Sequence, residues 1–365
     1  MSRKLRFLDD SINRVDISVG LRNCFFAQRA IYYGRKGETE RGLADISEIK
    51  SASVPHTLPV IVMRNLAEGV IDFYCSNGLK AIDKAMRAYS LASSGALISE
   101  QALSAAWLAH FLDSEHDIRA AARFANEALL ISAVDAHDTR ARAGLVVAQN
   151  LGIAGRPDLA AGWYTSVLRH ANVVGDELTV SALMFNRTLE EVARWRQSKL
   201  QPDLVETAFT NAATAASSAS NFDKLIENHG LENLNPLLIA QILSLNGSYQ
   251  QAFDIYSTEL PREHYALRMQ ADFVADQSLC LLHLGRTSEA QQTMELALEK
   301  LLPETHPDDR AATHSRAAIL FAKVGDSARA EHEHRAAARL WAEYSRLQLS
   351  MVELFSRVPI EVDPA

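Results

Sequence analysis

The sequence has few of the residues that interrupt helices. Its 365 residues include 16 glycines and 10 prolines, whereas alanine is abundant and occurs in adjacent runs. Alanine has the highest helix propensity and lets neighbouring helices approach closely. Such runs are Ala105-Ala106, Ala121-Ala122, Ala160-Ala161 and Ala336-Ala337-Ala338. The scarcity of glycine and proline argues against a loop-rich or all-β protein, and the alanine runs predict helices.

Cysteine is also scarce. Cys24, Cys75 and Cys280 are far apart in the sequence and fall in apolar, helical stretches. An odd number of widely spaced cysteines excludes a disulfide framework and a zinc knuckle. We expect all three to be small buried apolar side chains in a reducing compartment.

Long apolar runs are missing. No stretch of about 18 uncharged apolar residues occurs, which is the length that a membrane-spanning helix needs. The basic residues near Met1 are not followed by the apolar segment of a signal peptide. The net charge is −8 and the pI is about 5.9, which disfavours direct nucleic-acid binding. We therefore expect a cytoplasmic protein that binds neither membranes nor nucleic acids.

Catalytic motifs are absent as well. The sequence contains no glycine-rich phosphate loop, GxSxG elbow or HExxH motif. Cys280 and His283 are three residues apart on one expected helix, a spacing that arises often by chance. His332 and His334 point about 200° apart on a helix, so they cannot bind one ion together. We expect no catalytic residue, no metal site and no cofactor, and hence no enzyme.

A helix pair is the clearest unit that is present. Between Asp276 and Pro303, apolar residues follow helical spacing on either side of a short polar link. Gly285 is expected to end the first helix, because glycine accepts the left-handed conformation of a helix C-terminus. Ser288 is expected to cap the second helix.

The same pair recurs along the chain. A small residue in the second helix of each pair recurs about every 40 residues, and such a regular interval is typical of repeat proteins. It falls on Gly42, Ala81, Ala121, Ala160, Ala208, Ala252, Ala290 and Ala330. An irregular helical bundle is the alternative interpretation, but such a bundle has no reason to keep this step.

These units resemble the tetratricopeptide repeat (TPR). Ser278, Leu281, Gly285, Ala290, Met294 and Ala297 occupy the characteristic positions of that repeat. The link His306-Pro307-Asp308 is similar to that of long-form repeats in kinesin light chains, signalling ATPases and bacterial peptide-receptor regulators. Val174-Gly175-Asp176 is similar to a link in bacterial sensor proteins. The resemblance spans roughly residues 20–345.

The resemblance implies an all-α fold, a right-handed superhelical α-solenoid of about eight TPR-like helix pairs with a C-terminal capping helix. The eighth and least regular pair joins a helix near Leu178–Lys199 to one near Asp203–Ser217. An irregular stretch near residue 200 suggests two arrays, 1–200 and 201–365, although one continuous solenoid is the alternative.

A solenoid of this kind implies binding, with the first helix of each pair lining a concave groove. We expect a non-catalytic scaffold or regulator of bacterial type whose partner is a protein or a peptide. A chaperone-type carboxylate clamp is disfavoured, because Asn186 and Arg316 are too far apart to belong to one. The candidate groove residues are polar side chains on the first helices: Arg64, His110, Arg142, Gln149, Asn186, Gln241, Asp272, His283, Arg316 and Lys323.

Two other functions stay open. A structural adaptor would bind partners through the convex face, or would form a homodimer through the C-terminal helix. The apolar residues available for such a dimer are Trp341, Tyr344, Leu347, Leu349, Met351, Leu354 and Phe355. An enzyme with an unrecognised helical site is the third alternative.

Overall fold

The computed structural model is all-helical. It describes residues 2–53, 55–201, 212–232, 234–258, 260 and 267–357, and within these ranges it contains seventeen helices and no strand. The chain divides into two compact units. The first unit comprises residues 1–183, 222–230 and 351–365, and the second comprises 184–221 and 231–350. This confirms the all-α fold class.

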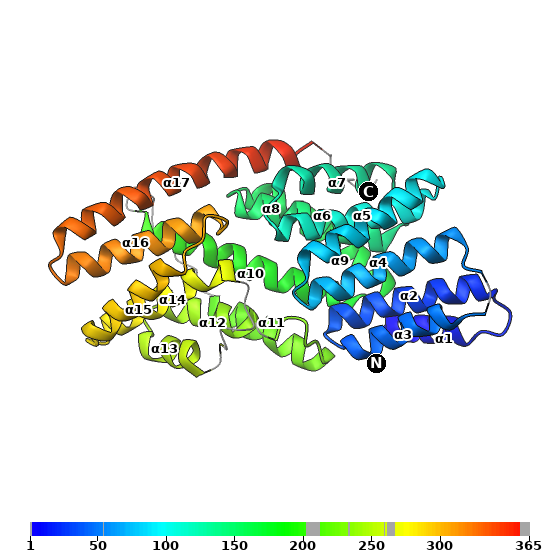
Figure 1. Cartoon of the computed structure of the whole chain (residues 1–365), viewed down its shortest axis with the longest axis horizontal. Coiled ribbons are helices and arrows are strands. Elements are labelled where there is room, and N and C mark those ends of the chain that lie inside the picture. The colour runs from blue at the N-terminus through cyan, green and yellow to red at the C-terminus, as the bar shows by residue number, and fades with distance from the viewer. Residues whose placement is uncertain are drawn as a thin grey trace. The chain divides into compact units, whose positions relative to one another are not determined.

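The first unit contains nine complete helices, most of which form successive antiparallel pairs (Figure 1). The pairs α2/α3, α4/α5, α6/α7 and α8/α9 pack tightly, and α1 packs on α2. Their bounds are α1 Arg3–Asn13, α2 Val19–Lys36, α3 Thr39–Ser51, α4 Leu58–Tyr74, α5 Gly78–Ser94, α6 Ile98–Ser114, α7 Ile118–Ile131, α8 His137–Ile153 and α9 Pro157–Val174.

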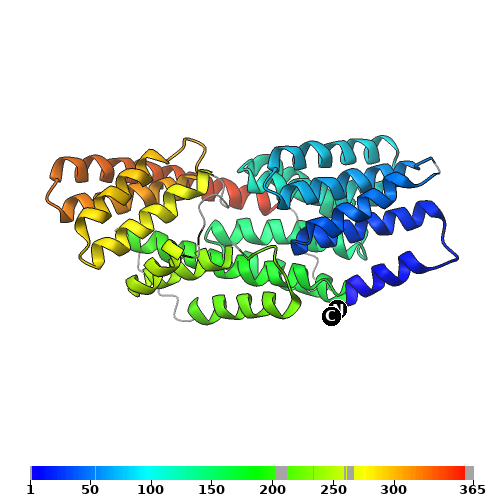
Figure 2. The same cartoon turned by 60° about the horizontal axis from the view of Figure 1, so that its bottom comes forward.

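The second unit continues the helix pairs, which Figure 2 shows side by side in yellow and orange. Here α12 packs on α13, and α14 packs on α15 and α16. The helices are α12 Leu234–Leu245, α13 Tyr249–Thr258, α14 Leu267–His283, α15 Thr287–Glu299, α16 Pro307–Lys323 and α17 Ser327–Phe355.

Three helices have residues in both units. The division falls within α10 (Glu177–Leu200), within α11 (Ala212–Ile226) and near the end of α17. The structure thus places α10 where the sequence predicts a helix near residues 178–199. Ala208 and the first part of the expected helix 203–217 lie outside the described residues, and the division at residue 200 stays a prediction.

Small residues allow the helices of each pair to pack closely. The repeated small positions Ala81, Ala121, Ala252 and Ala290 are buried, as the repeat predicts. The Ser278 hydroxyl on α14 donates a hydrogen bond of 2.6 Å to the carbonyl of Ala290 on α15. A larger side chain at either position would push the two helices apart.

Two helix ends differ from the sequence-based expectation. Gly285 does adopt the left-handed conformation, with φ of +78°, just after α14. The next helix begins at Thr287 with Arg286 as its N-cap, so the prediction that Ser288 caps it was wrong. The last repeat and the expected closing helix form one continuous helix, α17.

The cysteines and the C-terminal helix have mixed environments. Cys280 is buried and Cys24 is half-buried, but Cys75 is exposed at the end of α4, so the expectation that all three are buried was wrong. Trp341 and Tyr344 on α17 are buried, whereas Leu349 is 72% exposed. The proposed dimer surface stays a prediction. No helix in the described ranges is long and apolar enough to cross a membrane.

Candidate functional site

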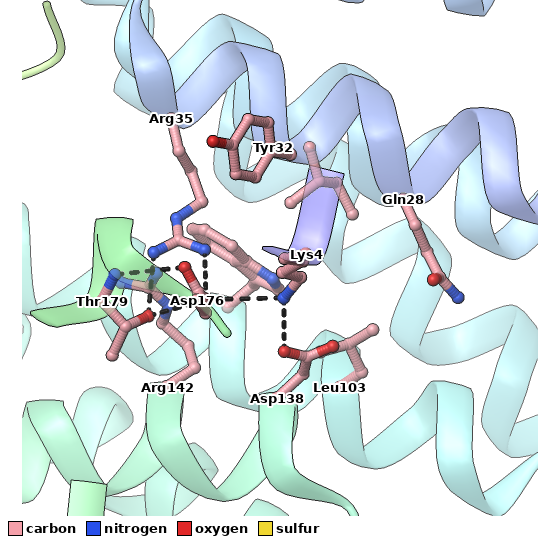
Figure 3. Close-up of a pocket in the computed structure, with 11 residues that line it drawn as sticks. Lys4, Gln28, Tyr32, Arg35, Leu103, Asp138, Arg142, Asp176 and Thr179 are labelled. Atoms are coloured by element: carbon pink, nitrogen blue, oxygen red, sulfur yellow. Dashed lines mark hydrogen bonds and ion pairs between the residues drawn. The ribbon is translucent and has the colours of Figure 1, made fainter. Parts of the chain in front are cut away.

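The candidate site is a pocket in the first unit, shown in Figure 3. It contains about 510 Å³ of space not filled by protein atoms, part of it open to solvent. Its walls come from α1, α2, α6, α8 and the start of α10, and the lining residues are Lys4, Gln28, Ile31, Tyr32, Arg35, Leu103, Trp107, Asp138, Arg142, Asp176 and Thr179.

A buried ion pair forms one wall of the pocket. The Arg35 guanidinium on α2 donates hydrogen bonds to Asp176 (2.7 Å) and to the Thr179 hydroxyl (2.8 Å). The Thr179 hydroxyl also donates to Asp176, at 2.9 Å. Burial alone would raise the pKa of Asp176, but the charges of Arg35 and Lys4 hold that pKa well below its usual value. Asp176 is therefore ionised, and its carboxylate is already hydrogen-bonded to Arg35 and Thr179.

Helix α1 contributes a second cation to the pocket. The Lys4 ammonium forms an ion pair with Asp138 and lies 3.4 Å from Asp176 (Figure 3). The Ser2 hydroxyl, at the N-cap of α1, donates to Glu177 at 2.7 Å. These contacts fix the start of α1 against the residues that open α10.

Arg142 is the third cation, and it differs from the other two. Its side chain is only 4% exposed, yet no hydrogen bond or ion pair joins it to any described residue. Its guanidinium carbon lies 4.2 Å from the centre of the Trp107 ring, and Figure 3 shows the side chain extending toward Arg35 and Asp176. Burial, together with the charge of Arg35, lowers the pKa of Arg142 to about 10.

The charges of the pocket do not balance. Lys4, Arg35 and Arg142 carry three positive charges, whereas Asp138 and Asp176 carry two negative ones. Lys4 and Arg35 are already paired with the aspartates. The surplus charge therefore resides on Arg142, which a bound anion could neutralise.

The other predicted residues of the first unit occupy different environments. His110 on α6 packs against Phe73 and Trp107, with ring centres 5.0 Å and 5.9 Å apart. Burial and, second, the charge of Arg142 lower the pKa of His110 well below its usual value. Arg64 on α4 and Gln149 on α8 are half-buried and do not line the pocket. Arg142 is thus the one predicted groove residue that the structure places there.

In the second unit, two predicted residues, Asp272 and Arg316, belong to a buried charge network, and a third, Gln241, contacts it. This network consists of Arg196, Asp272, Asp276, Asp308, Asp309 and Arg316. Arg316 lies 2.6 Å from Asp272 and 3.2 Å from Asp276, and is 2% exposed. Arg196 contacts Asp272 and Asp309, both at 2.8 Å. Gln241 donates to Asp272 at 3.4 Å, at the edge of the network. Unlike Arg142, Arg316 has its charge matched within the chain.

The last three predicted residues lie apart from this network. His283, at the end of α14, is exposed and stacks on Tyr249 with ring centres 4.0 Å apart. Lys323, at the end of α16, is exposed, and Asn186 on α10 is half-buried. The ten predicted residues are therefore divided between the two units, four in the first and six in the second.

The reactive groups noted in the sequence have ordinary environments. Burial, with Asp276 as a further cause, raises the pKa of Cys280 to about 12, so its thiol is not a nucleophile at neutral pH. The Nδ1 atom of His314 lies 2.5 Å from a Glu333 carboxylate oxygen, while His332 and His334 are exposed. In the part of the chain that the structure describes, no cluster of His, Cys, Asp or Glu is arranged to hold a metal ion.

Most residues of the pocket are not among those that the sequence predicts. Lys4, Arg35, Trp107 and Asp176 were not predicted, although Asp176 ends the Val174-Gly175-Asp176 link. The sequence feature that could have indicated them is a charged residue inside an apolar helical segment. Arg35, for example, follows the apolar run Ile31–Tyr33. Charged residues in such segments are rarely fully buried unless they are paired or functional.

Comparisons with known proteins give a structural likeness alone. No family model matches the chain, and no curated protein matches it. A solved Rap protein complexed with Competence and Sporulation Factor has a TM-score of 0.61 and 15% identity, and the match covers 94% of this chain and 98% of that one.

The Rap conjugation gene regulator of the plasmid pLS20, in complex with the Phr* peptide, has a TM-score of 0.53 and 16% identity. That match covers 91% of this chain and 97% of the regulator. At such low identity the likeness establishes the fold. The chain has the TPR-type helical-repeat fold that the sequence predicts.

Proposed function

We propose that this chain is a non-catalytic regulator or scaffold that binds a peptide or a protein segment, and that the pocket of the first unit is part of its binding surface. The observation that carries this proposal is the unpaired guanidinium of Arg142, buried in the pocket wall against Trp107. A buried charge without a partner costs free energy, so its retention is best explained by a ligand that pairs with it.

The structural likeness supports a peptide as the ligand. One similar structure holds Competence and Sporulation Factor, and the other holds the Phr* peptide. Helical-repeat proteins stack their helix pairs to form extended surfaces, and such surfaces suit extended chains. The pocket adds aromatic and polar groups that can contact both side chains and backbone of a peptide.

The chemistry of the pocket supports binding without catalysis. Its acidic groups are occupied, since Asp176 accepts hydrogen bonds from Arg35 and Thr179, and Asp138 pairs with Lys4. A general base needs a free acceptor close to the proton that it removes. The pocket instead offers an unpaired hydrogen-bond donor, Arg142, which is suited to holding an anionic group.

The test is selection of peptides by the purified full-length protein. A synthetic mixture of short linear peptides with free termini is incubated with the protein, bound peptides are identified by mass spectrometry, and their dissociation constants are measured by calorimetry. We expect a recurrent sequence pattern and micromolar affinity.

Two variants provide the comparison. Arg142→Met removes the charge and keeps an apolar stem, while Arg119→Met removes an exposed arginine of the same unit. Peptide affinity should fall for the first and stay unchanged for the second. If no peptide binds, the proposed function is refuted. If both variants bind peptide equally well, the pocket is not part of the binding surface.

A further inference from the structure

We infer that the pocket is a carboxylate site, in which Arg142 binds one carboxylate group of the peptide ligand. This inference rests on the proposed function and specifies which chemical group enters the pocket. Three features of the pocket point to a carboxylate: the lack of an ion-pair partner for Arg142, the charge balance around it and the apolar walls beside it.

The state of Arg142 indicates an anion. Arg142 is more than nine-tenths buried and lines the pocket, and no hydrogen bond or ion pair joins it to a described residue. A guanidinium has five N–H donors arranged to match the two oxygens of a carboxylate. A cation–π contact with the Trp107 ring stabilises the positive charge of the guanidinium.

The charge balance favours a single negative charge. Three cations and two aspartates line the pocket, which leaves an excess of one positive charge. A carboxylate carries one negative charge and would neutralise it. A phosphate group carries nearly two, and it would lie in the same pocket as Asp138 and Asp176, which repel it.

The apolar side chains beside Arg142 indicate which part of a peptide bears the carboxylate. Ile31 and Trp107 are buried, and Leu103 is half-buried on α6. These side chains provide apolar surface next to the charged group. A C-terminal residue with an aliphatic side chain, or a glutamate side chain, combines a carboxylate with apolar carbon atoms in the required way.

The test uses a matched pair of small probes. N-acetyl-leucine carries a carboxylate beside an aliphatic side chain, and N-acetyl-leucinamide is its neutral counterpart of nearly the same shape. Binding to the full-length protein is measured by ligand-observed NMR titration. We expect millimolar binding of the acid and at least about tenfold weaker binding of the amide, since charge-assisted hydrogen bonds are the stronger ones.

Variants then assign the binding to Arg142. Arg142→Met should weaken N-acetyl-leucine binding at least about tenfold, and Arg119→Met should leave it unchanged, with circular dichroism confirming that both fold. Glutaric acid monoamide, which mimics a glutamate side chain, distinguishes the two sources of carboxylate by its relative affinity. Equal binding of acid and amide, or equal binding of the acid by both variants, would overturn the inference. Tighter binding of inorganic phosphate than of the acid would do so too.

The outcomes separate this inference from the proposed function. If selected peptides bind equally well with free and amidated carboxyl groups and without Arg142, the protein binds peptides but has no carboxylate site. If N-acetyl-leucine binds through Arg142 and no peptide does, the carboxylate site exists but the proposed function fails.

Discussion

The two buried arginines Arg142 and Arg316 illustrate opposite situations at the scale of single residues. Arg316 neutralises Asp272 and Asp276, so its removal leaves buried carboxylates without a counter-charge. Arg142 forms no hydrogen bond or ion pair with any described residue, and it contacts the Trp107 ring instead. The same substitution is therefore expected to have different effects at the two positions.

The Arg316→Met variant should lower the free energy of unfolding by about 3–5 kcal/mol, because breaking a buried ion pair is strongly destabilising. The Arg142→Met variant should change it by about 1 kcal/mol or less, and can raise it, because it removes an unpaired buried charge. Urea unfolding followed by circular dichroism measures both. A large loss of stability for Arg142→Met would mean that its charge is structural.

The buried charge network makes stability depend on pH. Burial and the neighbouring charge of Asp308 raise the pKa of Asp309 to about 7. A raised carboxyl pKa contributes stability that is complete below the unfolded value near 4 and is lost as pH rises through about 7. His306 acts in the same direction: burial lowers its pKa, but Asp308 outweighs this and raises it.

Stability of the wild type should therefore fall between pH 5 and pH 8. The Asp309→Asn variant should reduce this fall by on the order of 2 kcal/mol, since it removes the largest shift in that range. The opposite shift of Asp308, whose pKa lies below its usual value, affects stability only at pH values below about 4. Thermal unfolding at several pH values tests this, and identical slopes for both proteins would contradict it.

At this scale the sequence predicted residue types better than their partners. Arg142 was identified from its place on a first helix, but its lack of a partner depends on the surrounding fold. The ion pair of Arg35 and Asp176 joins residues 141 positions apart, which no local pattern reveals. Arg316 was assigned to a groove, and its burial with Asp272 arises from the packing of α14 on α16.

At the scale of elements, the segment 222–230 supports the pocket from outside. The backbone N–H of His229 donates to the Lys36 carbonyl at 2.9 Å, next to Arg35. The Asn228 amide donates to Asp223 within the segment at 2.8 Å and to Ser181 on α10 at 3.1 Å. Gly230 lies so close to the backbone of α2 that a Cβ atom on it would be 2.2 Å from the carbonyl oxygen of Arg35.

Gly230→Ala should therefore displace the end of α2 and weaken ligand binding at Arg142 together with stability, by roughly 1–3 kcal/mol in unfolding free energy. Gly20→Ala, near the start of α2, is the matched control, because its Cβ would meet no atom closer than 3.6 Å. That control should be neutral or slightly stabilising. Unchanged stability and binding in Gly230→Ala would show that the segment does not support the pocket.

Helix pairs and their small residues were predictable because helical spacing and alanine content are local properties. The length of α17 was not predicted, although its sequence contains no glycine or proline that would end a helix between Ser327 and Phe355. The N-cap at Arg286 was missed because Ser288 has the preferred cap side chain but lies inside the helix.

At the scale of the whole molecule, the repeat pattern predicted a solenoid and a binding function, but it distributed candidate residues over the full length. The structure divides them between two units and places Arg142, which has no ion-pair partner among the described residues, in a pocket of the first. That pocket combines α1 with helices far along the chain, so its location depends on tertiary contacts that the repeat register does not contain.

The most direct measurement is hydrogen–deuterium exchange of the full-length protein with and without a saturating selected peptide. The account predicts slower exchange in four of the five segments that line the pocket, at residues 28–35, 103–107, 138–142 and 176–179. It also predicts that Arg142→Met abolishes this effect at the same peptide concentration. Protection confined to the second unit, around residues 272–316, would contradict the assignment of the binding site.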